Sequence, residues 1–322
     1  MKISLDEAAE KAAAVLEAHK VAPENARCVA RALVLAEADG LGGHGLMRLP
    51  FYAAQAKCGK IDGHARPSLV KPTASAITVD AAYGFSYPAI DLAVDALIGV
   101  TREQGVAAAS IRRSGHCGAM GLVVERFATH GLVALMFANT PGAMAVWGGK
   151  RPLLGTNPIA CAFPRSNAWP VVIDLSLSKA ARGHIVAAKQ KGENIPSDWA
   201  LDAHGQQTDD PEAALNGTML PAGGAKGAAL ALMVEVLAAG LTGGQYAFEA
   251  SSFLDSKGPP PATGQLIIAF DPSKLGGSVA HIERMFVEAH GDHVRLPGER
   301  RRQNRNRAAS EGLTVQESWF QI

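Results

Sequence analysis

The sequence has few of the features that define several common protein classes. Its cysteines lie far apart and form no CxxC pair, which argues against a zinc ribbon and a disulfide scaffold and suits a reducing compartment: Cys28, Cys58, Cys117 and Cys161. No serine lies in a GxSxG elbow, and no GxxxxGK[ST] loop is present, so nothing supports a serine hydrolase or a P-loop triphosphatase. His290 and His293 have no further ligands at a suitable spacing, and we expect no metal site.

Excess charge and long apolar runs are scarce as well. The 322 residues carry a net charge of +1, so bulk electrostatics recruits neither nucleic acid nor an anionic membrane. The most apolar stretch, 227–244, is interrupted by Glu235 and barely reaches spanning length, which favours a buried helix over a membrane span. The first residues form an early helical pattern with acidic side chains and make a poor signal peptide. We therefore expect a cytoplasmic protein.

Hydrophobic periodicity predicts a mixed α/β fold. Helices are expected near both ends of the chain, at 5–19, 23–36, 51–57 and 282–290, and the last of these is expected to pack back on the first. Ser4 and Glu7 fit a capping box at the first helix. Strands are expected at 76–80, 106–111, 132–139, 159–163, 170–175 and 265–270, and further helices at 88–102, 118–129, 179–189 and from 226. The strands 159–163 and 170–175 are too close for a crossover helix, which predicts an antiparallel pair.

A match to the dinucleotide fingerprint GxGxxG is formed by Gly40, Gly42 and Gly45. The fingerprint requires a strand before the glycines and a helix after them. Here the preceding segment has a helical period, and Pro50 falls inside the required helix. The sequence therefore argues against a Rossmann assignment.

Three glycine-containing segments are candidates for chemistry. His44 and Arg48 offer a proton carrier with a pKa near neutrality and a planar fork for a carboxylate, although a loop histidine and a surface arginine fit the pattern too. The turn 155–158 (GTNP) offers backbone amides and a hydroxyl before a strand, or is simply a tight turn. The segment 223–227 (GGAKG) opens a helix and either holds an anion or allows close packing. The basic run 295–307 is either a solvated face or a phosphate site.

Six segments together resemble the type 2 malate/L-lactate dehydrogenase family, which is unrelated to the Rossmann lactate dehydrogenases. They occur in order over nearly the whole chain: DGLGGHGLMRLP from Asp39, RSGHCGAMG from Arg113, RPLLGTNPIACAFP from Arg151, VIDLSLSKAARGH from Val172, MLPAGGAKGAALALMVEVLAAGLTGG from Met219 and VRLPGERR from Val294. The resemblance implies a non-Rossmann cofactor domain with a largely antiparallel sheet (76–274) and a helical domain built from both termini (1–75 and 275–322). It also implies a homodimer that uses NADPH, or alternatively NADH.

The resemblance assigns roles by position. His44 corresponds to the catalytic proton donor, and Arg48 and Thr156 correspond to the ligands of the substrate carboxylate. The corresponding cofactor contacts are Cys117, Gly118, Ala119, Met120, Gly121, Asp174, Leu175, Ser176, Arg182, Gly183, Arg295, Gly298 and Arg300. A guanidinium matches phosphate geometry, so Arg295 and Arg300 favour a 2′-phosphate and hence NADPH. Two departures matter: Gly43 replaces the usual serine before the histidine, and His184 stands where some members have a supporting acid.

The segment from Asp174 through the Ala-rich helix is most similar to the branch that reduces 1-pyrroline-2-carboxylate and 1-piperideine-2-carboxylate to L-proline and L-pipecolate. The sequence-based expectation is therefore an NAD(P)H-dependent imine reductase acting on a small molecule. A 2-hydroxy-acid dehydrogenase of the malate or lactate type is the alternative, because both chemistries need the same parts. A non-catalytic nucleotide-binding homologue is the second alternative.

Overall fold

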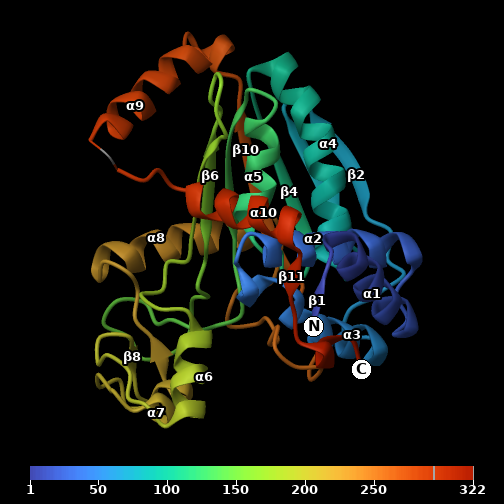
Figure 1. The fold of residues 1–322 in the computed structure, drawn as a ribbon. Helices are drawn as coiled ribbons and strands as arrows, with labels where there is room; N and C mark the ends of the chain where they lie inside the picture. Colours follow the sequence, from blue (N-terminus) through green and yellow to red (C-terminus); the bar gives the residue numbers. More distant parts are fainter. Residues whose placement is uncertain (293, 322) are drawn as a thin grey trace.

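A seven-stranded sheet forms the centre of the molecule (Figure 1), and the computed structural model describes residues 1–292 and 294–321. The strand order is β2-β3-β4-β10-β5-β6-β7. Strands β3 and β4 are parallel and the other five neighbouring pairs are antiparallel, which confirms both the largely antiparallel sheet and the antiparallel β6–β7 pair. The strands are β2 (Ser68–Thr73), β3 (Ala76–Asp80), β4 (Val106–Ser114), β5 (Val133–Ala138), β6 (Ile159–Phe163), β7 (Val171–Leu175) and β10 (Thr263–Phe270).

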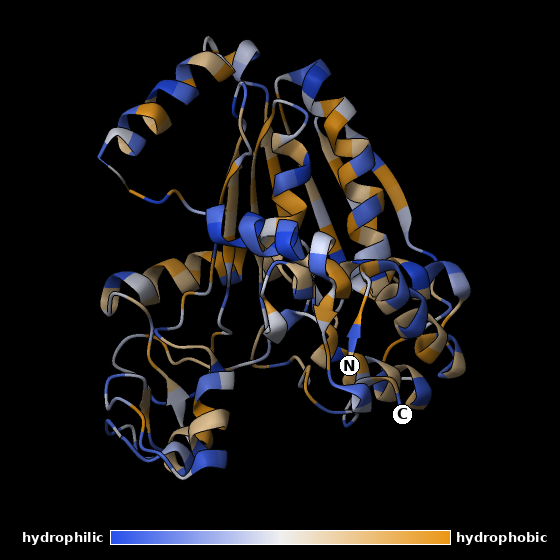
Figure 2. Cartoon of the chain, in the orientation of Figure 1, coloured by the Kyte–Doolittle hydropathy of each residue, from blue (hydrophilic) through white to orange (hydrophobic). Residues whose placement is uncertain are grey.

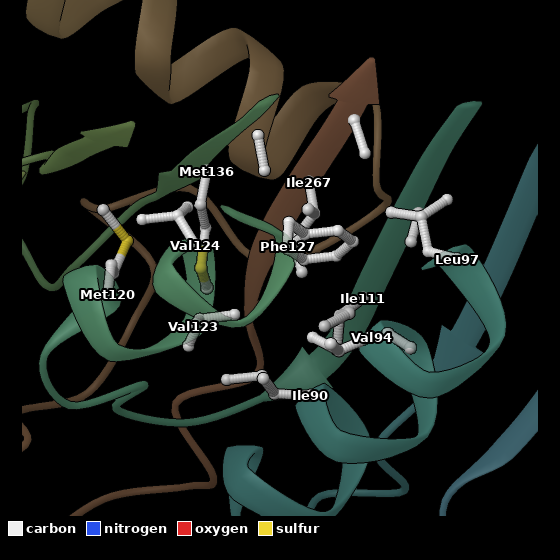
Figure 3. Close-up of a cluster of buried hydrophobic side chains, with 14 of the residues drawn as sticks. Ile90, Val94, Leu97, Ile111, Met120, Val123, Val124, Phe127, Met136 and Ile267 are labelled. Carbon is white, nitrogen blue, oxygen red and sulfur yellow. The ribbon is translucent and has the colours of Figure 1, made fainter. Parts of the chain in front are cut away.

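Helices α4 (Ser86–Gln104) and α5 (Met120–Ala128) cover one face of this sheet. Figure 3 shows Phe127 of α5 beside Ile267 and Met136 of the sheet, with Leu97 of α4 in the same core. All four side chains are nearly inaccessible to solvent. Burying a side chain of this size contributes about 1.5–3 kcal/mol, so this layer is a main source of the stability of the fold.

The opposite face of the sheet carries a second core. Along β5, Met136 belongs to the first core and Phe137 to the second, as the alternation of side chains along a strand requires. The second core includes α8 (Ala225–Glu235) and the π-helical turn η3 (Val236–Gly240) that continues it. It extends into a smaller lobe that contains α6 (Arg182–Lys191), β8 (Ala200–Leu201), α7 (Pro211–Asn216) and β9 (Thr218–Met219).

The two ends of the chain meet in a third core. Strand β1 (Lys2–Ile3) pairs with β11 (Leu313–Thr314), and the cluster includes α1 (Leu5–Ala18), α2 (Pro23–Ala38), α3 (Leu49–Cys58) and η5 (Glu317–Phe320). The Ser4 hydroxyl accepts a hydrogen bond from the Glu7 amide, which confirms the Ser4 half of the expected capping box, whereas the Glu7 carboxylate pairs with Lys11. Among the described residues, no helix is both long and apolar enough to cross a bilayer.

The C-terminal helices differ from the sequence-based prediction. Helix α9 (Val279–Gly291) does not pack back on the first helices, so that prediction is wrong; Glu283 pairs with Arg165, and Phe286 packs on Phe163 beside the β6–β7 turn. The C-terminal helix that packs against α2 is instead α10 (Glu299–Glu311). The hydropathy pattern did not predict this helix, because it is almost entirely hydrophilic (Figure 2).

Ion pairs hold α10 in place where apolar side chains are lacking. Arg301 and Arg305 both bond the buried carboxylate of Asp39 on α2, and Arg305 also bonds Glu125 on α5. The guanidinium of Arg305 lies 5.4 Å from the ring centre of Trp169. Because breaking one partner of a buried ion pair leaves an uncompensated charge, this network fixes the position of α10.

Candidate active site

One end of the sheet gathers most of the predicted site residues. The antiparallel register aligns the last residue of β4, Ser114, with the first residue of β10, Thr263. At the same end β5 stops at Ala138, and β6 begins at Ile159, which pairs with Leu175, the last residue of β7. The segments 115–121, 139–140, 155–157 and 174–176 therefore all leave the sheet at this end, although they are far apart in the sequence.

His44 and Arg48 lie in two short 3-10 turns between α2 and α3, η1 (Gly42–His44) and η2 (Leu46–Arg48). Helix α2, not a strand, precedes these glycines, which confirms that the GxGxxG match is not a dinucleotide fingerprint. The Glu37 carboxylate accepts from the Leu46 amide at 2.9 Å, and a Cβ at Gly45 would collide with that carboxylate. Glu37 and Gly45 thus fix the path of the backbone between the two turns.

His44 stacks on a second histidine that the sequence analysis did not include. Its ring lies 5.3 Å from the ring of His116, and the two planes differ by 14°. His116 Nδ1 lies 2.6 Å from the hydroxyl of Tyr52, which lies 3.0 Å from the hydroxyl of Tyr87. The ring of Phe253 lies 5.3 Å from the ring of His116 and is tilted to it by 56°. The plane of His44 is therefore set by a buried aromatic and hydroxyl cluster.

Burial and the charge of Arg48 keep both histidines neutral. Desolvation, followed by the nearby Arg48 guanidinium, lowers the pKa of His44 to about 4. The pKa of His116 is lowered well below its usual value, again first by burial and then by Arg48. His44 Nδ1 is enclosed without a hydrogen-bond partner. The site thus holds a neutral imidazole beside a guanidinium, and Nδ1 of that imidazole is free to form a hydrogen bond.

The two departures from the family pattern lie in different places. Gly43 is exposed, and a Cβ added there would meet no atom within 4 Å. His184 lies on α6, where its ring tilts against Trp199 at 6.0 Å. The group that contacts the His44 ring is His116 on the loop after β4. The aromatic ring stacked on His44 thus comes from His116 and not from position 43 or 184.

Thr156, which precedes β6, bonds a second threonine, Thr140, which follows the neighbouring strand β5. The Thr156 amide donates to the Thr140 hydroxyl at 2.9 Å, and the two hydroxyl oxygens lie 3.2 Å apart. Arg48 is oriented by a bond from its Nε to the carbonyl of Gly43 at 2.7 Å. The Thr156 amide is occupied by this bond to Thr140, and the two hydroxyls and the guanidinium are groups that hold carboxylates in proteins.

The predicted cofactor segments Cys117–Gly121 and Asp174–Ser176 come together. Asp174 Oδ2 accepts from the Gly121 amide at 2.7 Å, and burial raises the pKa of Asp174, opposed by that bond and by Arg301. A Cβ at Gly121 would collide with Arg301 Nη1, an enclosed nitrogen without a hydrogen-bond partner. Burial raises the pKa of the Cys117 thiol to about 12, so it is not a thiolate. A helix start, glycines and a guanidinium suit a nucleotide phosphate.

The remaining cofactor candidates fall into two groups. Gly298 lies against β7, where the Val172 amide donates to the carbonyl of Pro297 at 3.2 Å, and Arg295 and Arg300 are exposed on either side. Arg300 directly precedes Arg301, whose Nη1 lies beside Gly121, and Gly298 lies against Val172, two residues before Asp174. Arg182 and Gly183 begin α6 in the smaller lobe, where Arg182 donates to the carbonyl of Leu215.

Within the described ranges, no group of three or more His, Cys, Asp and Glu side chains is arranged to hold a metal ion. His290 lies in the last turn of α9, whereas His293, its partner in the HxxH pair, lies outside the described residues.

Comparisons with known proteins agree with this architecture. The model of the malate/L-lactate dehydrogenase family matches residues 3–322, and the chain belongs to that family. A (2R)-3-sulfolactate dehydrogenase (NADP(+)) from Chromohalobacter salexigens is 52% identical, covering 98% of this chain and 95% of the relative. A Δ1-pyrroline-2-carboxylate/Δ1-piperideine-2-carboxylate reductase from Pseudomonas putida is 40% identical over 96% of this chain and 92% of its own length. The crystal structure of a Δ1-piperideine-2-carboxylate reductase from Pseudomonas syringae superposes with a TM-score of 0.94 at 37% identity, covering 100% of this chain and 98% of the other.

Proposed function

We propose that this oxidoreductase interconverts a small 2-hydroxy acid and its 2-oxo acid with NADP(H), and that the substrate carries a second anionic group, with (2R)-3-sulfolactate as the leading candidate. The observation that carries the proposal is the 52% identity to a sulfolactate dehydrogenase over nearly both full lengths, compared with 40% to an imine reductase. This similarity favours the hydroxy-acid alternative over the imine reduction that the sequence ranked first.

The site residues divide the work of oxidising a hydroxy acid. Arg48 and the Thr140–Thr156 pair hold the carboxylate and fix its orientation, which supplies a large part of the rate gain. His44, neutral in the free protein, accepts the hydroxyl proton as the carbonyl forms. The hydride leaving C2 would require bound NADP+ as its acceptor, and reduction of the oxo acid would require NADPH as the hydride donor. In reduction, the proton on His44 passes to the oxygen of the new alcohol.

A second negative charge on the substrate suits the electrostatics of this site. In the free protein the Arg48 charge holds the pKa of His44 down, after burial. A bound dianion opposes that charge and so counteracts the smaller of the two causes that lower the pKa of His44. Residue 43, next to His44 in the chain, is an exposed glycine, so no side chain at that position restricts the size of the substrate.

The cofactor assignment follows the groups at the end of the sheet. We propose that residues 117–121, 174–176 and 298 line the dinucleotide and that Arg295 and Arg300 bind the 2′-phosphate. The enclosed nitrogen of Arg301 beside Gly121 fits this assignment, because it lacks the acceptor that a phosphate or ribose oxygen supplies. The named relative uses NADP(+). The roles of Arg182 and Gly183 stay predictions.

Initial rates with purified protein test the proposal. NADPH oxidation is compared for 3-sulfopyruvate, oxaloacetate, pyruvate and 1-pyrroline-2-carboxylate, and then repeated with NADH. The account predicts the highest kcat/KM with 3-sulfopyruvate and with NADPH. A preference for pyruvate would contradict the claim that the substrate carries a second anionic group, but it would still support the hydroxy-acid dehydrogenase reaction. Tight NADPH binding without turnover of any compound would support the non-catalytic alternative.

Reduction of a cyclic imine is the second candidate, favoured by the superposition on a piperideine-2-carboxylate reductase over the whole chain. A protonated imine already carries its proton, so reduction depends less on His44 than reduction of a ketone does. Replacing His44 with glutamine therefore separates the two candidates: an imine reductase keeps most of its activity, and an oxo-acid reductase loses it.

We also propose a homodimer. Apolar side chains are exposed along α8 and η3, with Leu232 50%, Met233 43% and Leu241 66% accessible in the single chain. Exposed apolar surface of this kind marks association sites. Light scattering on the purified protein tests this, and a monomeric mass at micromolar concentration would contradict it. The cytoplasmic location stays a prediction.

A further inference from the structure

A buried glutamate lies behind the turn that carries Thr156. Glu235, the last residue of α8, is 3% exposed. Its Oε2 accepts from Asn157 Nδ2 at 2.7 Å, and its Oε1 accepts from Asn139 Nδ2 at 3.0 Å and from the Ala247 amide at 2.7 Å. Three donors therefore converge on one carboxylate, which suits an acceptor-only group.

The two asparagines are direct neighbours of the two threonines. Asn139 precedes Thr140 at the end of β5, and Asn157 follows Thr156 before β6. The asparagine side chains bond Glu235, whereas the threonines bond each other. Asn157 is fully buried with a φ of 40°, a conformation that a non-glycine residue rarely adopts without support.

Further bonds tie this arrangement to the histidine loop. Asn139 Oδ1 accepts from the Gly264 amide at 3.0 Å, at the start of β10. On either side of Gly264, the side chains of Thr263 and Gln265 donate to the carbonyl of Gly115, the residue before His116. The start of β10 therefore connects the threonine pair with the loop that stacks on His44.

We propose that Glu235 is a positioning residue: by holding Asn139 and Asn157, it sets the Thr140–Thr156 pair in the geometry that binds the substrate carboxylate. The inference rests on the proposed function in one respect, the assignment of Thr156 to a carboxylate. Glu235 does not touch the substrate and acts through its two amide partners.

Glu235→Gln tests the proposal at constant size. The glutamine places an NH2 group opposite Asn157 or Asn139, so one buried donor loses its acceptor. We measure binding of oxamate, an unreactive 2-oxo-acid analogue, to the NADPH-bound protein, together with KM, kcat and the NADPH dissociation constant. Hydrogen–deuterium exchange of the peptide containing Thr156 reports on the turn itself.

The expected result is about tenfold weaker oxamate binding and a similar rise in KM, with kcat less affected and NADPH binding unchanged. Exchange at the turn becomes faster. Thr140→Val gives the same signature, and the double variant is less than additive because both changes act on Thr156. Asn25→Asp is the matched control: its side chain bonds the carbonyls of Gly63 and Ala65, so it loses thermal stability but keeps oxamate affinity.

Unchanged oxamate affinity in Glu235→Gln, with or without faster exchange, would overturn the positioning role. An equal loss of affinity in Asn25→Asp would also overturn it, since the effect would then be general destabilisation. If the parent protein binds oxamate but turns over no oxo acid, the proposed reaction fails while the Glu235 comparison still gives its answer. If the parent does not bind oxamate, the Glu235 proposal fails, whereas the proposed reaction is decided separately by the rates with 3-sulfopyruvate.

Discussion

The substrate side and the cofactor side of the candidate site use their arginines in opposite ways. On the substrate side, Arg48 lies beside two neutral imidazoles whose pKa values it helps to lower. On the cofactor side, Arg301 and Arg305 are bound by Asp39 and Glu125, and their network holds a helix. The difference indicates that a lone guanidinium tunes the chemistry of its neighbours, whereas a guanidinium matched by carboxylates serves mainly to fix structure.

The largest expected effect comes from removing the imidazole on the substrate side. His44→Gln should lower kcat for oxo-acid reduction by about 10²–10⁴-fold, because general acid–base catalysis by a positioned side chain contributes that much. NADPH binding should stay unchanged, and single-turnover kinetics measures the chemical step. His204→Gln, at an exposed turn, is the control and should keep the parent rate. Equal activity in both variants would remove His44 from the mechanism.

A smaller effect is expected from changing the shape of the substrate-side cation. Arg48→Lys keeps the charge but loses the planar fork and the bond to Gly43, so KM for the acid should rise by about 10- to 100-fold with NADPH binding intact. Arg112→Lys, on the surface of β4, is the control for the same chemical change. If Arg48→Lys kept the parent affinity for substrate, its assignment to the carboxylate would be wrong.

A substitution on the cofactor side should weaken cofactor binding and leave substrate binding unchanged, the reverse of the effect expected for Arg48→Lys. Arg300→Gln removes an exposed guanidinium and should weaken NADPH binding by about tenfold, while NADH binding and KM for the acid stay the same. Fluorescence titration with the two cofactors measures this, and Arg284→Gln on α9 is the matched control. A parallel loss for NADH would mean that Arg300 does not contact a 2′-phosphate.

The smallest effect is expected at Gly43. Because a Cβ there meets open space, Gly43→Ser should change the thermal midpoint little, on the order of the shift of an ordinary surface substitution. Gly45→Ser is the contrasting variant, since its side chain collides with Glu37 and should destabilise the protein clearly. Similar midpoints for the two variants, measured by calorimetry, would show that the turns are looser than described.

The fold was largely predictable, because it follows local patterns. The strands 76–80 and 159–163 match their predicted limits, and the helix predicted from Lys226 begins one residue earlier, at Ala225. Helix α10 was missed because charged side chains hold it, and a hydrophobic period cannot reveal a helix fixed by ion pairs. Helix α9 was misplaced because the sequence does not say which surface an amphipathic helix covers.

The site was predictable only in part, because its contacts join distant segments. His44 and Arg48 are close in the sequence and were found through their glycines, and the family resemblance supplied Thr156. His116, Tyr52 and Thr140 were not identified as site residues, since the stacking and hydrogen bonds that bring them in exist only in the folded chain. Glycines on both sides of the His116–Cys117 pair, as around His44, were the available signal. Glu235 and Asn157 lie 78 positions apart, beyond any local pattern.

The pH dependence of kcat/KM for oxidation of the hydroxy acid tests the central claim, a His44 kept neutral beside Arg48, most directly. This parameter reports ionisations of the free enzyme and free substrate. With the pKa of His44 lowered to about 4, the base is available throughout, so kcat/KM should stay level as the pH falls from about 8 to about 5 and decline only below that. Arg48→Gln should move the decline to higher pH, because the repelling charge is gone. A decline centred near the ordinary pKa of histidine in the parent protein, unmoved in Arg48→Gln, would contradict the account.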